Sequence, residues 1–265
     1  MMLDVNHVYK TFHPGTINER RALAGVDLHL EEGDFVTVIG GNGAGKSTLL
    51  NAVAGVWPVD GGSIVIDGND ITGLPDYKRA PFIGRVFQDP MMGTAPDMQL
   101  EENLALAYRR GKKLGLRWHI NREERDMYRE RLRELNLGLE DRLTTKVGLL
   151  SGGQRQAVTL LMASLQKPRL LLLDEHTAAL DPATAAKVLE LSDRIVQENG
   201  LTTMMITHNM KDAIRHGNRL IMMNKGEIIF DCRGEEKAKL TVEDLLEKFT
   251  QISGSTLDND RALLG

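Results

Sequence analysis

The sequence predicts an α/β fold with a mainly parallel sheet, an antiparallel β subdomain and an α-helical subdomain. Short apolar runs recur between helical patterns, which is typical of buried parallel strands joined by crossover helices. The first part of the chain instead alternates apolar and polar residues, as half-buried antiparallel strands do. We expect a single domain over residues 1–265, with a core at 1–89 and 166–235, a helical subdomain at about 90–165, and a C-terminal helix and tail at 236–265.

Each element follows from a local pattern. The alternating segments predict antiparallel strands at 3–12, 26–30 and 63–67. Apolar runs predict core strands at 35–39, 83–87, 170–173, 202–206 and 220–223, with a hairpin strand at 227–231. Helical spacing of apolar residues predicts helices at 49–54, 99–110, 122–135, 157–165 and 241–249. The stretch 90–149 is charged and has no strand pattern, so we interpret it as a helical insertion.

Composition limits the class of protein. The chain is 42% hydrophobic and 26% charged, which is ordinary for a globular protein. Its net charge of −4 gives no basis for a nucleic-acid partner. The sequence contains no run of about 18 apolar residues and begins without a signal-peptide core. Cys232 is the single cysteine, so an internal disulfide is excluded and we expect a cytoplasmic protein.

The segment 40–48 reads GGNGAGKST and fits the phosphate-binding pattern G-x-x-x-x-G-K-[ST]. A predicted strand precedes it and a predicted helix follows, which is the context that this loop requires. Lys46 can reach the β- and γ-phosphates, and the Ser47 hydroxyl can ligate Mg²⁺. The loop therefore predicts a nucleoside triphosphate site made by Gly41, Asn42, Gly43, Ala44, Gly45, Lys46, Ser47 and Thr48.

Two carboxylates, Asp174 and Glu175, follow the predicted strand at 170–173. Ligands of parallel α/β sheets bind at the carboxyl ends of strands, so Asp174 is placed to hold Mg²⁺ beside Ser47. Glu175 is a candidate general base for the attacking water. An acidic pair at a solvated strand end is the alternative, and the phosphate loop upstream favours the functional interpretation.

The segment Leu150–Gln154 reads LSGGQ and precedes an apolar helix. Ser151 is a good N-cap, and two glycines permit close backbone approach to an anion at the start of a helix. Taken alone, the segment also fits an ordinary loop.

In combination, these motifs resemble the ATP-binding cassette (ABC) subunit of a membrane transporter. Six elements stand in the expected order over about residues 1–235: GGNGAGKS at 40–47, Gln88, LSGGQ at 150–154, LLLLDE at 170–175, Asp181 and His208. The resemblance implies a P-loop NTPase core and a Mg²⁺-dependent ATPase. The resemblance is to cassettes of the bacterial importer type. The segment Glu175-His176-Thr177 is similar to the sequence at this place in a branch of importers that takes up amino acids or small solutes.

The resemblance also assigns roles. Phe12 matches the aromatic residue that stacks on adenine, although it also fits a core position and Tyr9 is a second candidate. Gln88 resembles the residue that senses Mg²⁺ and the attacking water. His208 resembles the γ-phosphate switch, Glu175 the general base, and Asp181 the aspartate that couples two sites.

A second subunit is implied. In this family the LSGGQ segment, here 150–154 and called the signature motif, faces the phosphate loop of a partner. Ser151, Gly153 and Gln154 would therefore contact ATP held by another copy. We therefore expect an ATP-dependent homodimer that is peripheral on the inner face of the membrane. Its partners would be transmembrane permease subunits, with a solute-binding protein in the full complex.

Two features leave alternatives open. His176 replaces the proline usual in this family, and it either tunes Glu175 or is a tolerated loop residue that faces solvent or the partner. A basic run, Arg109 to Arg117, could approach lipid headgroups or a partner, or form a solvated helix end.

Two functions other than transport share parts of this pattern. A soluble ABC ATPase, such as one serving cluster assembly, shares the motifs. A regulator that binds nucleotide without hydrolysing it is disfavoured by the presence of Glu175 and His208.

Overall fold

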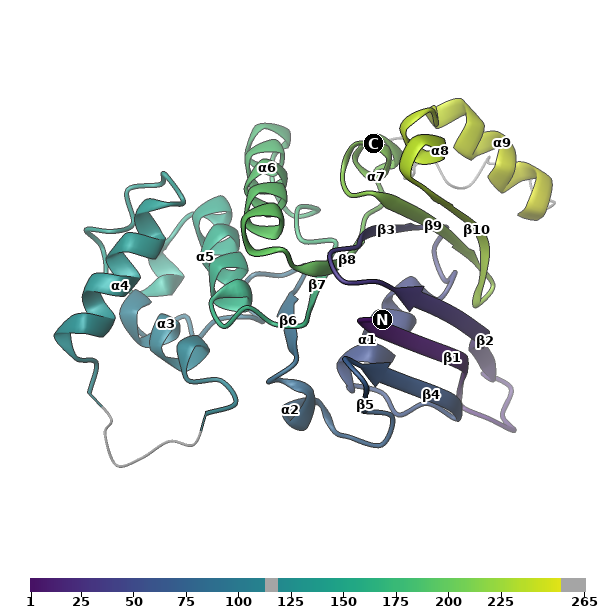
Figure 1. Ribbon diagram of the computed structural model, residues 1–265, viewed down its shortest axis with the longest axis horizontal. Coiled ribbons are helices and arrows are strands. Elements are labelled where there is room, and N and C mark those ends of the chain that lie inside the picture. The colour runs from purple at the N-terminus through teal and green to yellow at the C-terminus, as the bar shows by residue number, and fades with distance from the viewer. Residues whose placement is uncertain (113–118, 254–265) are drawn as a thin grey trace. The chain divides into compact units, whose positions relative to one another are not determined.

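The structure, a computed structural model, describes residues 1–112 and 119–253 (Figure 1). It divides into two compact units. The first comprises Met1–Arg79 and the chain from Gly200 onward, and the second comprises Ala80–Asn199. The subdomain limits predicted at 90 and 165 stay predictions. Within the described residues, no helix is both long and apolar enough to cross a membrane.

The first unit contains an antiparallel sheet with the strand order β2-β1-β4-β5. Leu3 of β1 stands opposite Leu30 of β2 and Ile66 of β4, and all three side chains are fully buried. The predicted strand at 3–12 is confirmed, whereas the strand predicted at 26–30 begins earlier. The bounds are β1 (Leu3–Phe12), β2 (Arg20–Leu30), β4 (Gly61–Ile66) and β5 (Asn69–Asp70).

A second sheet of the first unit has the order β10-β9-β3-β8. Strand β3 pairs in parallel with both β8 and β9, and β10 returns antiparallel to β9 as a hairpin. Both flanking strands place their carboxyl ends at the same edge as that of β3, where the phosphate loop begins. The bounds are β3 (Phe35–Ile39), β8 (Thr202–Ile206), β9 (Arg219–Asn224) and β10 (Glu227–Arg233).

Five helices are described in this unit. The helix after the phosphate loop, α1, begins at Lys46 rather than at 49, because Gly45 takes the N-cap position with a left-handed backbone. Buried Arg79 closes its other end by donating from Nη1 to the carbonyls of Ala52 and Val53, both at 2.8 Å. The bounds are α1 (Lys46–Ala54), α2 (Asp76–Arg79), α7 (Met210–Arg215), α8 (Gly234–Ala238) and α9 (Val242–Ser253).

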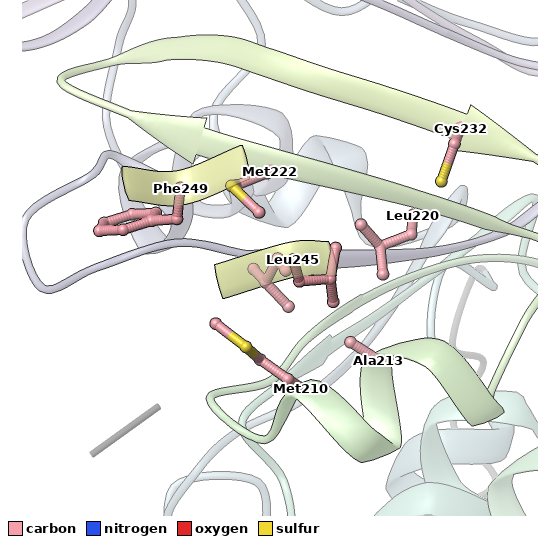
Figure 2. Packing of buried hydrophobic residues seen from close by; sticks show 8 residues of the cluster. Met210, Ala213, Leu220, Met222, Cys232, Leu245 and Phe249 are labelled. Carbon is pink, nitrogen blue, oxygen red and sulfur yellow. The ribbon is translucent and has the colours of Figure 1, made fainter. Parts of the chain in front are cut away.

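The C-terminal helix α9 packs onto the hairpin and onto α7 (Figure 2). Leu245 and Phe249 of α9 share a buried cluster with Met210 and Ala213 of α7 and with Ile39 at the end of β3. The same cluster takes in Leu220, Met222 and Cys232 from the hairpin. Helix α9 therefore supports both the strand that leads into the phosphate loop and the helix that follows His208.

The second unit combines a parallel strand pair with helices. Strand β6 pairs with β7, and Val86 stands opposite Leu173. Helix α4, predicted at 122–135, buries Tyr128 and Leu132. The described parts of 90–149 contain helices and turns but no strand. The bounds are β6 (Ile83–Val86), β7 (Leu170–Asp174), α3 (Leu100–Tyr108), α4 (Arg122–Arg133), η1 (Val147–Leu149), α5 (Gly152–Ser164) and α6 (Pro182–Asn199).

The basic run is not a free positive surface over its described part. Arg109 pairs with Glu124 at 3.0 Å, and Arg110 donates to the Ala163 carbonyl at 3.0 Å. Burial lowers the pKa of Arg110. Lys112 lies over the Tyr108 ring, with Nζ 3.7 Å from the centroid. Arg109 and Arg110 thus tie the end of α3 to α4 and α5, whereas Lys112 is exposed, and residues 113–118 lie outside the described residues.

Candidate nucleotide-binding site

The phosphate loop requires glycine where it passes close to neighbouring backbone. Gly40 and Gly45 have φ angles of 147° and 107°. A Cβ on Gly45 would lie 2.6 Å from the Ala22 carbonyl oxygen, and one on Gly40 would overlap the Met223 carbonyl. The loop is therefore wrapped tightly between β2 and β9, and its shape depends on residues that lack a Cβ. A loop of this shape can cradle phosphate groups with its backbone amides.

Lys46 and Ser47 open helix α1 at the base of this loop. The Lys46 ammonium is buried and donates to the carbonyls of Gly40 at 2.7 Å and Gly41 at 3.2 Å. Its charge is thus held inside the loop by carbonyl oxygens. The Ser47 side chain is exposed at the positive end of the helix dipole, which suits an oxygen ligand to a cation bound with phosphate. The residues fit Mg²⁺ and a polyphosphate.

His208 lies at the same sheet edge as the loop. It follows β8, and β8 runs parallel to β3 with Val38 opposite Ile206. The amide of Thr207 donates to the Val38 carbonyl at 3.2 Å. Asn209 then caps α7 by accepting from the Lys211 and Asp212 amides at 2.9 and 3.3 Å. A strand register on one side and a helix cap on the other therefore hold His208 beside the loop.

Phe12 and Tyr9 differ in their surroundings. The Phe12 ring meets Trp57 edge-on, with centroids 4.9 Å apart, and stays half-buried. Tyr9 instead covers the backbone of Gly25, where its hydroxyl would lie 2.8 Å from an added Cβ. Trp57 therefore holds the Phe12 ring in place near the phosphate loop. Phe12 fits the predicted base platform, the ring that stacks on adenine, better than Tyr9 does.

Within the second unit, Asp174 and Glu175 end strand β7. Asp174 Oδ2 accepts from Arg85 Nη2 at 3.2 Å, and the Arg85 guanidinium also lies 4.5 Å from the centre of the Phe87 ring. Desolvation lowers the pKa of Arg85, while Asp174 opposes that shift. Glu175 has a φ of 47°, a left-handed conformation that is strained for a residue other than glycine.

Gln88 is exposed two residues beyond β6, at the edge where Asp174 lies on the neighbouring strand. The backbone just before it is tied to the signature helix α5. Gln156 of that helix is fully buried and donates from Nε2 to the Phe87 carbonyl at 3.2 Å. The predicted water-sensing residue and the signature helix are thus linked within one unit.

The signature segment forms a capping box at the start of α5. Ser151 Oγ accepts from the Gln154 amide at 3.2 Å, and Gln154 Oε1 accepts from the Ser151 amide at 3.1 Å. A Cβ on Gly153 would overlap Thr184 Cγ2, so glycine lets α5 pass close to the start of α6. Asp181 caps that start by accepting from the Thr184 amide at 3.1 Å. Hydrogen bonds from the Thr184 side chain and amide lower the pKa of Asp181.

His176 does not face solvent or a partner, so that expectation was wrong. Its side chain is 2% exposed, and Nε2 lies 2.9 Å from Ser192 Oγ of α6. Ser192 Oγ in turn donates to the Val188 carbonyl at 2.8 Å. The ring that replaces the usual proline therefore fixes the segment after Glu175 to α6.

The two units each hold part of the predicted site. The first brings together Phe12, the phosphate loop and His208, and the second brings together Gln88, Asp174, Glu175, Asp181 and the signature residues. Among the described residues, no three carboxylate, imidazole or thiol groups gather as a metal site. No local motif indicates Arg85, Gln156 or Arg20, whose guanidinium donates to the Gly43 carbonyl of the loop.

Comparisons with known proteins agree with this geometry. The sequence matches the ABC transporter family over residues 23–178. It is 47% identical to the tyrosine transport ATP-binding protein of Clostridioides difficile, over 94% of this chain and 98% of that protein. It is 34% identical to a xylose/arabinose import ATP-binding protein of Sulfolobus acidocaldarius, over 95% of each.

Solved structures show the same fold. A dimeric ATP-binding cassette in a post-hydrolysis state, bound to ADP and phosphate, superposes with a TM-score of 0.75 at 31% identity, over 88% of this chain and 98% of that one. Another cassette in its ADP conformation gives 0.75 at 28% identity, over 96% and 99%. The P-loop NTPase fold predicted from sequence is confirmed. The chain therefore belongs to the ABC transporter family and is an ATP-hydrolysing cassette of that family.

Proposed function

We propose that the chain is the Mg²⁺-dependent ATPase subunit of a membrane importer and works as a homodimer. The observation that carries the proposal is the capping box of the signature motif. Ser151 Oγ accepts a hydrogen bond from the Gln154 amide, so its proton stays available for donation, and the side chain is exposed. A hydroxyl presented in this way at a helix start suits a phosphate approaching from another molecule.

The roles of the residues follow from their chemistry. The Lys46 ammonium and the loop amides hold the β- and γ-phosphates, and Phe12 stacks on the base. Ser47, Gln88 and Asp174 would hold Mg²⁺, which when bound offsets phosphate charge. Glu175 accepts the proton of the attacking water as general base.

The remaining roles concern the γ-phosphate and the partner. His208 contacts the γ-phosphate through its imidazole. Ser151, Gly153 and Gln154 would complete the site of the partner copy. Burying phosphate charge is costly unless donors surround it, so ATP favours closure of the dimer and hydrolysis favours opening. Asp181, which caps α6 beside Gly153, would couple the two sites.

Transport requires membrane partners, and we infer permease subunits and a solute-binding protein, with no nucleic acid. The chain would then lie on the cytoplasmic face of the membrane through these permeases. Relatives with nearly full coverage are named as transport or import ATP-binding proteins, which supports this inference. The relative that is 47% identical is named for tyrosine, so an aromatic amino acid is the substrate to test first. A soluble ATPase for cluster assembly is less well supported.

The experiment is affinity purification from membranes followed by reconstitution of the co-purified complex in vesicles. We expect permease subunits to co-purify and labelled tyrosine to accumulate with ATP, while sugars, sulfonates and polyamines do not. The Glu175→Gln variant should co-purify equally and transport nothing. Recovery of the chain without any membrane subunit would contradict the importer, and uptake of a different solute would contradict only the substrate.

A further inference from the structure

Arg20 lies between the predicted base platform and the phosphate loop. It is the first residue of β2 and stands opposite Phe12 in the strand register. Its Nη2 donates to the Gly43 carbonyl at 2.8 Å, so the guanidinium rests on the rim of the loop. The side chain is exposed there. One cation thus stands opposite Phe12 in the strand register and contacts the rim of the phosphate loop.

We propose that Arg20 is a nucleotide-binding residue that contacts the phosphate chain of bound ATP and ADP. This inference rests on the proposed role of loop 40–48. A guanidinium carries five N–H donors in a planar fork that matches phosphate oxygens, and it stays charged at all working pH values. The bond to Gly43 uses one of these donors and fixes the orientation of the fork.

The loop geometry supports a contact with phosphate rather than a purely structural bond. Gly43 has a φ of 79°, and both it and Asn42 are exposed, so the loop rim is open to a ligand. Lys46 supplies positive charge from inside the loop, through its contacts with Gly40 and Gly41. Arg20 would supply positive charge from the outer side, and the phosphate chain would lie between two cations of different chemistry.

The neighbouring residue offers a matched control. Arg21 carries the same charge, is also exposed, and stands opposite Thr11. Successive side chains of a strand point to opposite faces, so Arg21 is directed away from the face that carries Arg20. Loss of Arg21 therefore removes an equal charge from the same strand without removing the contact with the loop.

The experiment measures ATP and ADP binding by calorimetry for the wild-type chain, Arg20→Gln, Arg20→Lys and Arg21→Gln. We expect Arg20→Gln to weaken both nucleotides about tenfold, the change expected for losing a hydrogen bond to a charged group. Arg20→Lys should recover part of the affinity, and Arg21→Gln should bind as the wild type does. Melting temperatures without nucleotide should agree for all four proteins.

Two results would overturn the proposal. Equal affinities of Arg20→Gln and Arg21→Gln would remove Arg20 from the site. A loss of affinity accompanied by a fall in the melting temperature without nucleotide would assign Arg20 a structural role in the loop. Failure of the wild-type chain to bind either nucleotide would instead contradict the proposed function.

Discussion

Arg85 donates from Nη2 to Oδ2 of Asp174 at 3.2 Å, joining two neighbouring parallel strands at the edge where the predicted Mg²⁺ ligand lies. Both side chains are mostly buried, at 14% and 16% exposed. The guanidinium therefore offsets part of the charge with which Asp174 would attract a cation, and it also orients the carboxylate.

Replacing Arg85 tests this relationship. We expect Arg85→Met to lower the Mg²⁺ concentration for half-maximal ATPase activity by roughly tenfold, the change given by about 1.4 kcal/mol of charge interaction. Arg85→Lys keeps a cation at the same strand position and should lie closer to the wild type. A Mg²⁺ titration of steady-state hydrolysis measures both. Identical half-saturation in all three proteins would show that Arg85 does not influence the cation site.

Glu175→Gln should lower turnover by roughly a hundredfold or more, because an amide cannot accept the proton of the attacking water. The substitution preserves shape at a position whose φ of 47° already strains the backbone. ATP should still bind, and an ATP-bound dimer should accumulate and be visible by size-exclusion chromatography. Steady-state hydrolysis at the wild-type rate would rule out Glu175 as the general base.

Phe249→Ala should lower the free energy of unfolding by about 3–5 kcal/mol, because it empties a large site in the cluster of α9, α7 and the hairpin. Phe249 is 6% exposed, whereas the next residue, Thr250, is exposed. Thr250→Ala is the control and should change little. Urea unfolding monitored by circular dichroism compares the two. Equal stabilities would mean that α9 is not part of the folded core.

Local patterns predicted the strands well. Strands at 3–12, 35–39 and 202–206 have the expected bounds, because alternation or an unbroken apolar run ends sharply at polar or glycine residues. Strand β5 and helices α2, α7 and α8 were not placed, since two to six residues are too few to show a period. Helix α6 was expected only as an unplaced crossover helix.

The site residues likewise fall into those that a local pattern indicates and those that it does not. The residues of the loop, the strand-end carboxylates and the signature segment follow from spacing along the chain, and their roles stay predictions. Arg20, Arg85 and Gln156 act through partners that lie 23, 89 and 69 residues away, so no local pattern reveals them. The contact of His176 with Ser192 of α6 is likewise set by tertiary packing.

The central claim is that one copy's signature motif completes the phosphate site of another. Exposed positions 42 and 151 allow a direct test by thiol cross-linking. Asn42→Cys is placed in one copy and Ser151→Cys in the other, both carrying Glu175→Gln. The native thiol interferes little, because Cys232 is buried and desolvation raises its pKa to about 11.

With a short bifunctional thiol reagent, the account predicts a cross-linked dimer of the two variants that forms with ATP and not with ADP. A control mixture of Asn42→Cys and Glu243→Cys, the latter an exposed position on α9, should stay uncross-linked. If ATP binds but the pair at 42 and 151 cross-links no more than this control, the shared site is contradicted.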